Sequence, residues 1–274
     1  MMHSASRQAL EALQEEQRSA FGSEGQASAL VTLAEELYAV AGLLVGSPQL
    51  RRMVGDPATP APARVKIIEG LIGSQIGDTA QQVVRAAVRQ RWSTPWNLCD
   101  ALESAGDDAL FAAAEKDRKL DTVEDELFRF ERIIQGDGGL VSLLDEPAVD
   151  PARRQTLLDS LVGNKVSDVT LALLKHAVTS TRKRSVLLAI DDLLELAAKR
   201  QERSIARVVS AAPLTDAQQR KLAEILSNMY GREITLRTAL DASVQGGLVI
   251  RVGDEVIDGS VASRFVSARA SLLG

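Results

Sequence analysis

The sequence is poor in the residues that most often carry chemistry. Its 274 residues include one cysteine, two histidines and only 3% aromatic residues. A single cysteine, Cys99, excludes an intramolecular disulfide and a cysteine-based metal site, and it is most simply interpreted as a small buried apolar residue. With so few aromatic residues, the core must consist mainly of Leu, Val, Ile and Ala, a composition that suits helix bundles.

The histidines and glycines do not form a recognisable site. His3 lies in a terminal segment that we expect to fray, and His176 lies on a predicted helix without a second histidine or a cysteine at ligand spacing. There is no G-x-S-x-G motif, and the glycines at 246, 247 and 253 fit neither a dinucleotide-binding nor a P-loop pattern. We therefore predict no catalytic, metal-binding or cofactor-binding residue and no cofactor.

An acidic turn leaves one enzymatic alternative open. Asp254, Glu255 and Asp258 lie close together in the sequence and could form a cation site. Acidic residues beside a turn ordinarily face solvent, and this spacing differs from that of an EF-hand.

The charge pattern argues against nucleic acid as the main partner. The 32 basic and 37 acidic residues give a net charge of −5 and are interspersed without a basic block. No apolar run approaches the roughly 20 residues that a membrane span needs, and residues 1–18 lack the apolar core of a signal peptide. We therefore expect a cytoplasmic protein that reaches a membrane only through other proteins.

Residues 1–203 follow a helical pattern almost throughout. One predicted helical face is formed by apolar residues at i, i+3, i+4 and i+7 spacing, namely Leu30, Leu33, Ala34, Leu37, Ala41 and Leu44. A later face is predicted from Leu187, Ile190, Leu194 and Ala197. Prolines at 48, 57, 60, 62, 147 and 151 mark helix boundaries.

An internal repeat divides this helical region. The segment that starts at Asp56 aligns without a gap with the segment that starts at Glu146, 90 residues later. Pro57 matches Pro147, and Arg64 matches Arg154. The agreement lies in the apolar positions and in the Pro and Gly residues, whereas the surface charges differ. We infer a duplicated helical domain, with the first copy ending near residue 105 and the second near residue 203.

The pattern changes after Ser204. Residues 204–212 and 233–240 are strand-like, with apolar alternation in the second. Between them, Thr215 and Gln218 form a capping-box pair that predicts the start of a helix. A strand over 248–252, a turn at Gly253 and a returning strand complete a hairpin. A final helix is predicted after Ser260.

These patterns together predict a mainly α fold with two tandem repeated helical bundles followed by a small α+β C-terminal domain. The predicted domains are 1–105, 106–203 and 204–274. Because no site chemistry is present, the chain is expected to be an adaptor that holds other proteins together.

The C-terminal residues resemble a known family. The V-x-S-A-x-P-L-T run at Val208–Thr215 and the G-G-L-V-I-x-V-G-D-x-V-I-D-G-S run at Gly246–Ser260 are similar to the signature of the delta subunit of bacterial F-type ATP synthases. That family is also similar to the mitochondrial oligomycin-sensitivity conferral subunit. The residues of this chain that carry the signature are Val208, Ser210, Ala211, Pro213, Leu214, Gly246, Gly247, Gly253, Asp258, Gly259 and Ser260.

The resemblance implies a non-catalytic stator role at the cytoplasmic face of the cell membrane. Its implied partners are the N-terminal helices of the ATP synthase alpha subunits, the beta subunits of the head, and the peripheral stalk subunit b, with no direct membrane insertion. The family usually has one helical domain, so the repeat leaves open which copy binds the alpha subunits. The alternative is a helical scaffold unrelated to ATP synthase, which would have no reason to carry the C-terminal signature.

Overall fold

The computed structural model describes residues 4–23, 26–73, 75–146, 148–180, 185–203, 205–230, 234–241, 244, 246–252 and 255–258. Over these ranges the chain is mainly helical and ends in a small sheet, which confirms the predicted fold class. Two compact units are present, residues 1–194 and residues 195–274, and each is described by itself.

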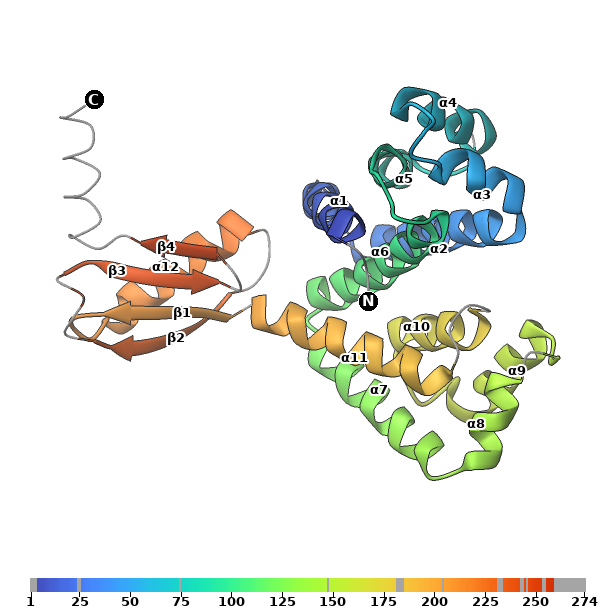
Figure 1. Cartoon of the computed structure of the whole chain (residues 1–274). Coiled ribbons are helices and arrows are strands. Elements are labelled where there is room, and N and C mark those ends of the chain that lie inside the picture. The colour runs from blue at the N-terminus through green and yellow to red at the C-terminus, as the bar shows by residue number, and fades with distance from the viewer. Residues whose placement is uncertain are drawn as a thin grey trace. The chain divides into compact units, whose positions relative to one another are not determined.

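The helical region consists of successive short and long helices (Figure 1). They are α1 (Ser4–Ser23), α2 (Ala27–Gly46), α3 (Pro48–Gly55), α4 (Ala61–Ile72), α5 (Asp78–Arg89), α6 (Pro95–Lys116), α7 (Leu120–Gln135), α8 (Gly138–Asp145), α9 (Pro151–Val162), α10 (Asp168–Thr179) and α11 (Val186–Arg203). Prolines occupy the first turns of α3, α4, α6 and α9, where the missing N–H has no helical partner to lose.

Helix bounds repeat along the chain as the sequence repeat predicts. The bounds of α3, α4 and α5 recur in α8, α9 and α10, each 90 residues later. Helix α1 has its counterpart in α6, and α6 has its counterpart in α11. One helix therefore corresponds to both the first and the last helix of a repeat.

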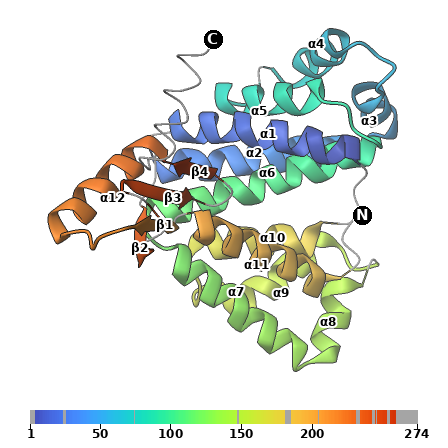
Figure 2. The ribbon, with the colours of Figure 1, turned by 60° about the vertical axis from the view of Figure 1, so that its left-hand side comes forward.

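Helix α6 takes part in both copies. It packs against α2, α3 and α5 of the first copy and against α7 and α10 of the second. Figure 2 shows it running between α2 and α10. Residue 105 lies inside this helix, so the division into 1–105 and 106–203 stays a proposal about the repeat. Residues 1–194 form one compact unit, because the copies share α6.

Helix α2 is the apolar centre of the first copy. The six residues of its predicted face are all buried, which confirms that prediction. By length and composition alone α2 could cross a membrane, which corrects the expectation that no apolar run is long enough. Its buried face packs against α6 as the core helix of a bundle does, and one such helix is weak evidence for a membrane span.

The apolar face predicted for α11 is partly wrong. Ile190 and Ala197 are buried, but Leu187 and Leu194 are only half-buried. The remaining buried positions are Val186, Ala189 and Leu193. Leucines occur in adjacent pairs along α11, so two overlapping faces both have helical spacing and packing selects between them.

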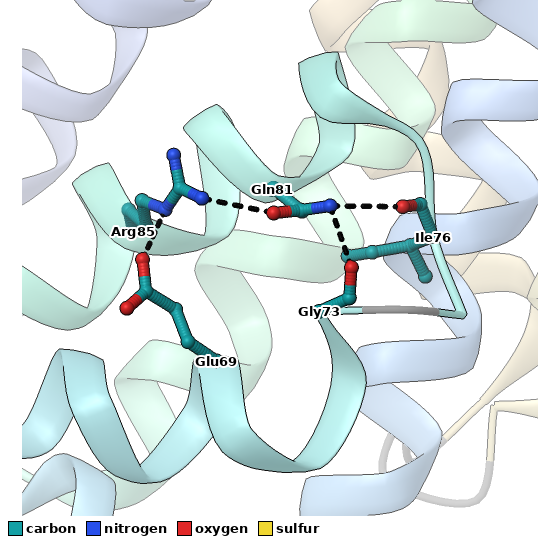
Figure 3. Close-up of polar contacts among 5 residues, drawn as sticks. All are labelled: Glu69, Gly73, Ile76, Gln81 and Arg85. Carbon is teal, nitrogen blue, oxygen red and sulfur yellow. Dashed lines mark hydrogen bonds and ion pairs between the residues drawn. The ribbon is translucent and has the colours of Figure 1, made fainter.

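Polar contacts between α4 and α5 join the two helices of the first copy (Figure 3). Arg85 forms an ion pair with Glu69 and donates to Gln81 Oε1 at 2.8 Å. Gln81 Nε2 in turn donates to the backbone oxygens of Gly73 and Ile76, at 2.8 and 3.1 Å. The amide therefore closes the turn that leads from α4 to α5.

The ion pair between these two helices recurs in the second copy with different residue types, whereas Leu171 stands at the position of Gln81. Lys175 Nζ lies 2.9 Å from Asp159 Oδ1, at the positions that correspond to Arg85 and Glu69. In the first copy the Glu36 carboxylate accepts from the backbone N–H of Gly77, at 2.9 Å. In the second, Glu126 accepts from the Ser167 N–H at 3.0 Å and from its hydroxyl at 2.9 Å. The duplication therefore preserves one ion pair and one glutamate contact with the N-cap residue of α5 or α10.

The C-terminal unit contains β1 (Ile205–Ser210), α12 (Asp216–Tyr230), β2 (Thr235–Leu240), β3 (Leu248–Val252) and β4 (Glu255–Asp258). The strand order is β2-β1-β3-β4. β1 pairs parallel with β2 and antiparallel with β3, and β3 and β4 form an antiparallel hairpin. All four predicted strands are confirmed.

Helix α12 covers one face of this sheet (Figure 1). Leu226 is buried against Val208 and Ile250, and Leu222 and Tyr230 pack around them. The predicted capping box is confirmed, because Thr215 N donates to Gln218 Oε1 at 2.9 Å and Gln218 N donates to Thr215 Oγ1 at 3.3 Å. The predicted helix after Ser260 lies outside the described residues.

Candidate interaction surfaces

The described residues contain no group of three or more His, Cys, Asp or Glu side chains that could hold a metal ion. Cys99 is fully buried, as predicted. Of the acidic turn, Glu255 accepts from the Tyr230 hydroxyl at 2.8 Å, Asp258 ends β4, and Asp254 lies outside the described residues.

The signature residues at 208–214 form the end of β1 and the connection to α12. Val208 is buried in the sheet, and the Ser210 hydroxyl donates to the backbone oxygen of Ala212 at 2.7 Å. Ala211 and Pro213 are exposed in the connection, and Leu214 packs against the core of the unit. This part of the signature therefore builds the fold.

The signature glycines before β3 have a backbone reason. Gly246 and Gly247 have φ angles of 79° and 84°, in the region that favours glycine. The chain bends there after β2 and enters β3 antiparallel to β1. Gly253, Gly259 and Ser260 lie outside the described residues, and Asp258 ends β4.

A contact that the sequence did not suggest joins the two helical copies. The rings of Tyr38 on α2 and His176 on α10 are stacked, with their centroids 3.7 Å apart. The Tyr38 hydroxyl donates to Asp107 Oδ1 on the shared helix α6 at 2.7 Å. Burial raises the pKa of Tyr38 well above its ordinary value, and the Asp107 carboxylate acts in the same direction. Tyr38 therefore keeps its proton and holds both copies against α6.

A pair of carboxyl groups lies between α7 and α11 of the second copy. Glu131 is buried, and its side chain forms a hydrogen bond with the side chain of Asp191. The corresponding residues of the first copy are Ala41 and Ala101, both buried. Burial raises the pKa of Glu131, and the neighbouring Asp191 raises it further.

We expect Glu131→Gln to stabilise the helical unit at pH 7. Because folding raises the pKa of Glu131, this group favours the folded state at low pH, and that contribution is lost as the pH rises through the raised pKa. A glutamine keeps the hydrogen bond to Asp191 without the second charge. Thermal unfolding at several pH values should show a gain at pH 7 that shrinks towards pH 4. Glu35→Gln, at an exposed position, is the control. Equal gains in stability for Glu131→Gln at pH 7 and pH 4 would contradict the raised pKa of Glu131.

Exposed apolar side chains recur at equivalent positions of the two copies. Leu43 on α2 and Met53 on α3 are 40% and 43% exposed. Ile133 on α7 and Leu143 on α8, each 90 residues later, are 58% and 54% exposed. Large apolar side chains therefore stay exposed at matched positions of the two copies. Their exposure follows from packing and could not be read from helical spacing alone.

Comparison with known proteins gives a family. A family model described as ATP synthase delta (OSCP) subunit matches residues 108–272. ATP synthase subunit delta of Streptomyces avermitilis is 42% identical over 240 residues, 88% of each chain. ATP synthase subunit delta of Streptomyces griseus subsp. griseus is 39% identical over 273 residues, 100% of each chain.

Two further similar proteins match this chain over different shares of their length. ATP synthase subunit b-delta of Mycobacterium sp. (strain KMS) is 39% identical over 271 residues, which are 99% of this chain and 61% of that protein. A chain in the structure of the Toxoplasma gondii mitochondrial ATP synthase hexamer is 25% identical, with a TM-score of 0.30, and the match covers 61% of this chain and 95% of that chain. The family model begins inside α6, and the Streptomyces griseus relative matches both helical copies. This chain belongs to the ATP synthase delta (OSCP) subunit family.

Proposed function

We propose that this chain is the non-catalytic stator subunit of a proton-translocating F-type ATP synthase. In this role it links the catalytic alpha/beta head to the peripheral stalk, so that rotation is coupled to ATP synthesis. The observation that carries the proposal is the family match over residues 108–272, together with a relative named ATP synthase subunit delta that matches along its full length. Its proposed location is the cytoplasmic face of the cell membrane, as a peripheral part of the complex.

The architecture supports a mechanical role. A stator must resist torque, and the two helical copies share α6 and are joined by the contact of Tyr38 with His176 and Asp107. We propose that the helical unit binds N-terminal helices of the alpha subunits and contacts the beta subunits of the head. The exposed apolar pairs suit this task, because an amphipathic helix binds through apolar anchors at helical spacing.

The predicted C-terminal domain, residues 204–274, is proposed to bind the end of stalk subunit b. Under this proposal the signature residues build the fold that presents the binding surface. Val208, Leu214, Gly246 and Gly247 support this reading, since they are core or turn residues in the structure.

Affinity purification of the tagged full-length chain from native membranes tests the proposal. We expect mass spectrometry to recover the alpha, beta and stalk subunits of ATP synthase together. Recovery of unrelated soluble proteins without these subunits would instead favour a helical scaffold unrelated to ATP synthase.

Two matched double variants extend the same test to the head. Leu43→Ser with Met53→Ser alters the first copy, and Ile133→Ser with Leu143→Ser alters the second. All four side chains are exposed, so we expect little change in stability. If one copy holds the alpha subunits, only the variant of that copy should lose them. Full retention of alpha by both variants would show that these side chains are not the anchors.

A further inference from the structure

Three arginines lie in one row across the C-terminal sheet. Arg207 of β1 pairs in register with Arg237 of β2 on one side and with Arg251 of β3 on the other. All three are exposed. The alternate positions of β1, Ala206 and Val208, are buried beneath α12, so the arginines project from the opposite face, since successive side chains of a strand point to opposite faces. We call these three residues the arginine row.

The surroundings of the arginine row are apolar. Val209 and Val249 occupy the next row on the same face and are half-buried. Val256 of β4 pairs with Arg251 and is 49% exposed. Among the described residues of the four strands, Asp258 is the acidic one on this face, and it pairs with Val249 in the neighbouring row. The face is therefore basic along one row and apolar beside it.

This arrangement has a cost in the free chain, because like charges directly opposite each other on paired strands repel. Within the described part of the chain, none of the three arginines has an ion pair with a carboxylate. Asp258 lies diagonally across from Arg251, and residues 259–274 contain no Asp or Glu. The three arginines therefore exceed the acidic residues on the described part of this face, which suits a partner of opposite charge.

We propose that this face binds an acidic amphipathic helix of a partner protein, laid across the strands. Neighbouring strands are about 4.8 Å apart, so the arginine row spans about 10 Å. Acidic residues at i, i+3 and i+7 of a helix extend over about 10.5 Å on one side of it, which matches the row. Arginine is suited to the task because its guanidinium binds a carboxylate through two parallel hydrogen bonds. Apolar residues of the same helix would cover Val209, Val249 and Val256.

The charge of the unit favours a protein partner over a polyanion. The C-terminal unit, residues 195–274, contains 11 basic and nine acidic residues, so its net charge is only +2. A nucleic acid or an anionic membrane requires a broad positive surface, whereas this row is short and has apolar neighbours. The inference rests on the proposed function only for the partner's identity, which would then be the acidic end of a stalk subunit.

A peptide titration with the full-length chain tests the chemistry of this face. The probes are a synthetic helical peptide with glutamates at i, i+3 and i+7 beside leucines, and the same peptide with glutamines. We expect the unaltered chain to bind the glutamate peptide about tenfold more tightly than the glutamine peptide. Arg207→Gln with Arg251→Gln should abolish this preference and raise the melting temperature of the free chain. Arg220→Gln with Lys221→Gln, which removes the same charge from exposed positions of α12, should leave the preference intact.

Two outcomes overturn the inference. One is an unchanged preference for the glutamate peptide after loss of Arg207 and Arg251. The other is arginine-dependent binding of duplex DNA or of vesicles containing anionic lipid without any preference between the peptides.

Affinity purification separates this inference from the proposed function. The Arg207→Gln, Arg251→Gln variant should retain the alpha and beta subunits and lose subunit b, and retention of subunit b would overturn the assignment of this face to the stalk. If the unaltered chain recovers no ATP synthase subunit, the proposed function fails, and the peptide titration still decides whether the face binds an acidic helix.

Discussion

Gly106→Ala should destabilise the helical unit by about 2–3 kcal/mol, although alanine is the better helix former. Gly106 lies inside α6, where the ring of Tyr38 packs directly on its backbone. A Cβ at this position would overlap Tyr38 Cε1 and lie 2.8 Å from its Cδ1. The ring must then move, which disturbs both its stacking on His176 and its hydrogen bond to Asp107.

Denaturant unfolding followed by circular dichroism measures this effect, and Gly42→Ala is the matched control. Gly42 is also helical, but a Cβ there meets nothing within 4 Å. That variant should be more stable by about 0.5–1 kcal/mol. If Gly106→Ala is as stable as Gly42→Ala, the contact between the two copies is not closely packed. If Gly106→Ala is destabilised as expected, affinity purification of this variant from membranes shows whether it also fails to recover the alpha and beta subunits.

Arg64→Ala should cost about 3 kcal/mol of unfolding free energy, and Arg154→Ala a similar amount. Arg64 is only 2% exposed, and its guanidinium donates to the backbone oxygens of Gln90 and Arg89 at 2.9 and 3.2 Å. These oxygens belong to the C-terminal end of α5, where carbonyl groups lack helical partners. Removing the side chain leaves the carbonyls without their donor and opens a cavity.

Arg154 repeats this arrangement in the second copy. It donates to the backbone oxygen of Val178 at 2.8 Å, near the end of α10, and to that of Leu144 at 3.4 Å. Arg153 is its exposed neighbour, so Arg153→Ala should change the free energy by less than about 0.5 kcal/mol. Because the copies share α6, either arginine variant should unfold residues 1–194 in one transition. Two separate transitions would show that the copies fold independently.

The repeat shows how far sequence reasoning reaches. Matching Pro57 with Pro147 and Arg64 with Arg154 predicted two copies of one helical pattern, because prolines, glycines and apolar spacing respond to local rules. The sharing of α6 between the copies was not predicted. A helix with apolar residues around much of its circumference can serve two neighbours, but spacing does not identify them.

In the C-terminal unit, too, some features were predicted from the sequence and others were not. Its strands and the capping box of Thr215 and Gln218 follow from local pattern, and the structure has them where the sequence predicts. The arginine row was not predicted, because Arg207, Arg237 and Arg251 lie far apart in the sequence and meet only through the pairing of three strands.

The amino-acid sequence by itself determined the mainly α class, the 90-residue repeat and the absence of recognisable catalytic motifs. These depend on residue type and on spacing within a few turns. Only the tertiary structure decided which face of α11 is buried, that Tyr38 of α2 contacts both His176 of α10 and Asp107 of α6, and that three arginines share one row. Such features arise from side-chain packing and strand register between distant segments, and local spacing is compatible with several solutions to both.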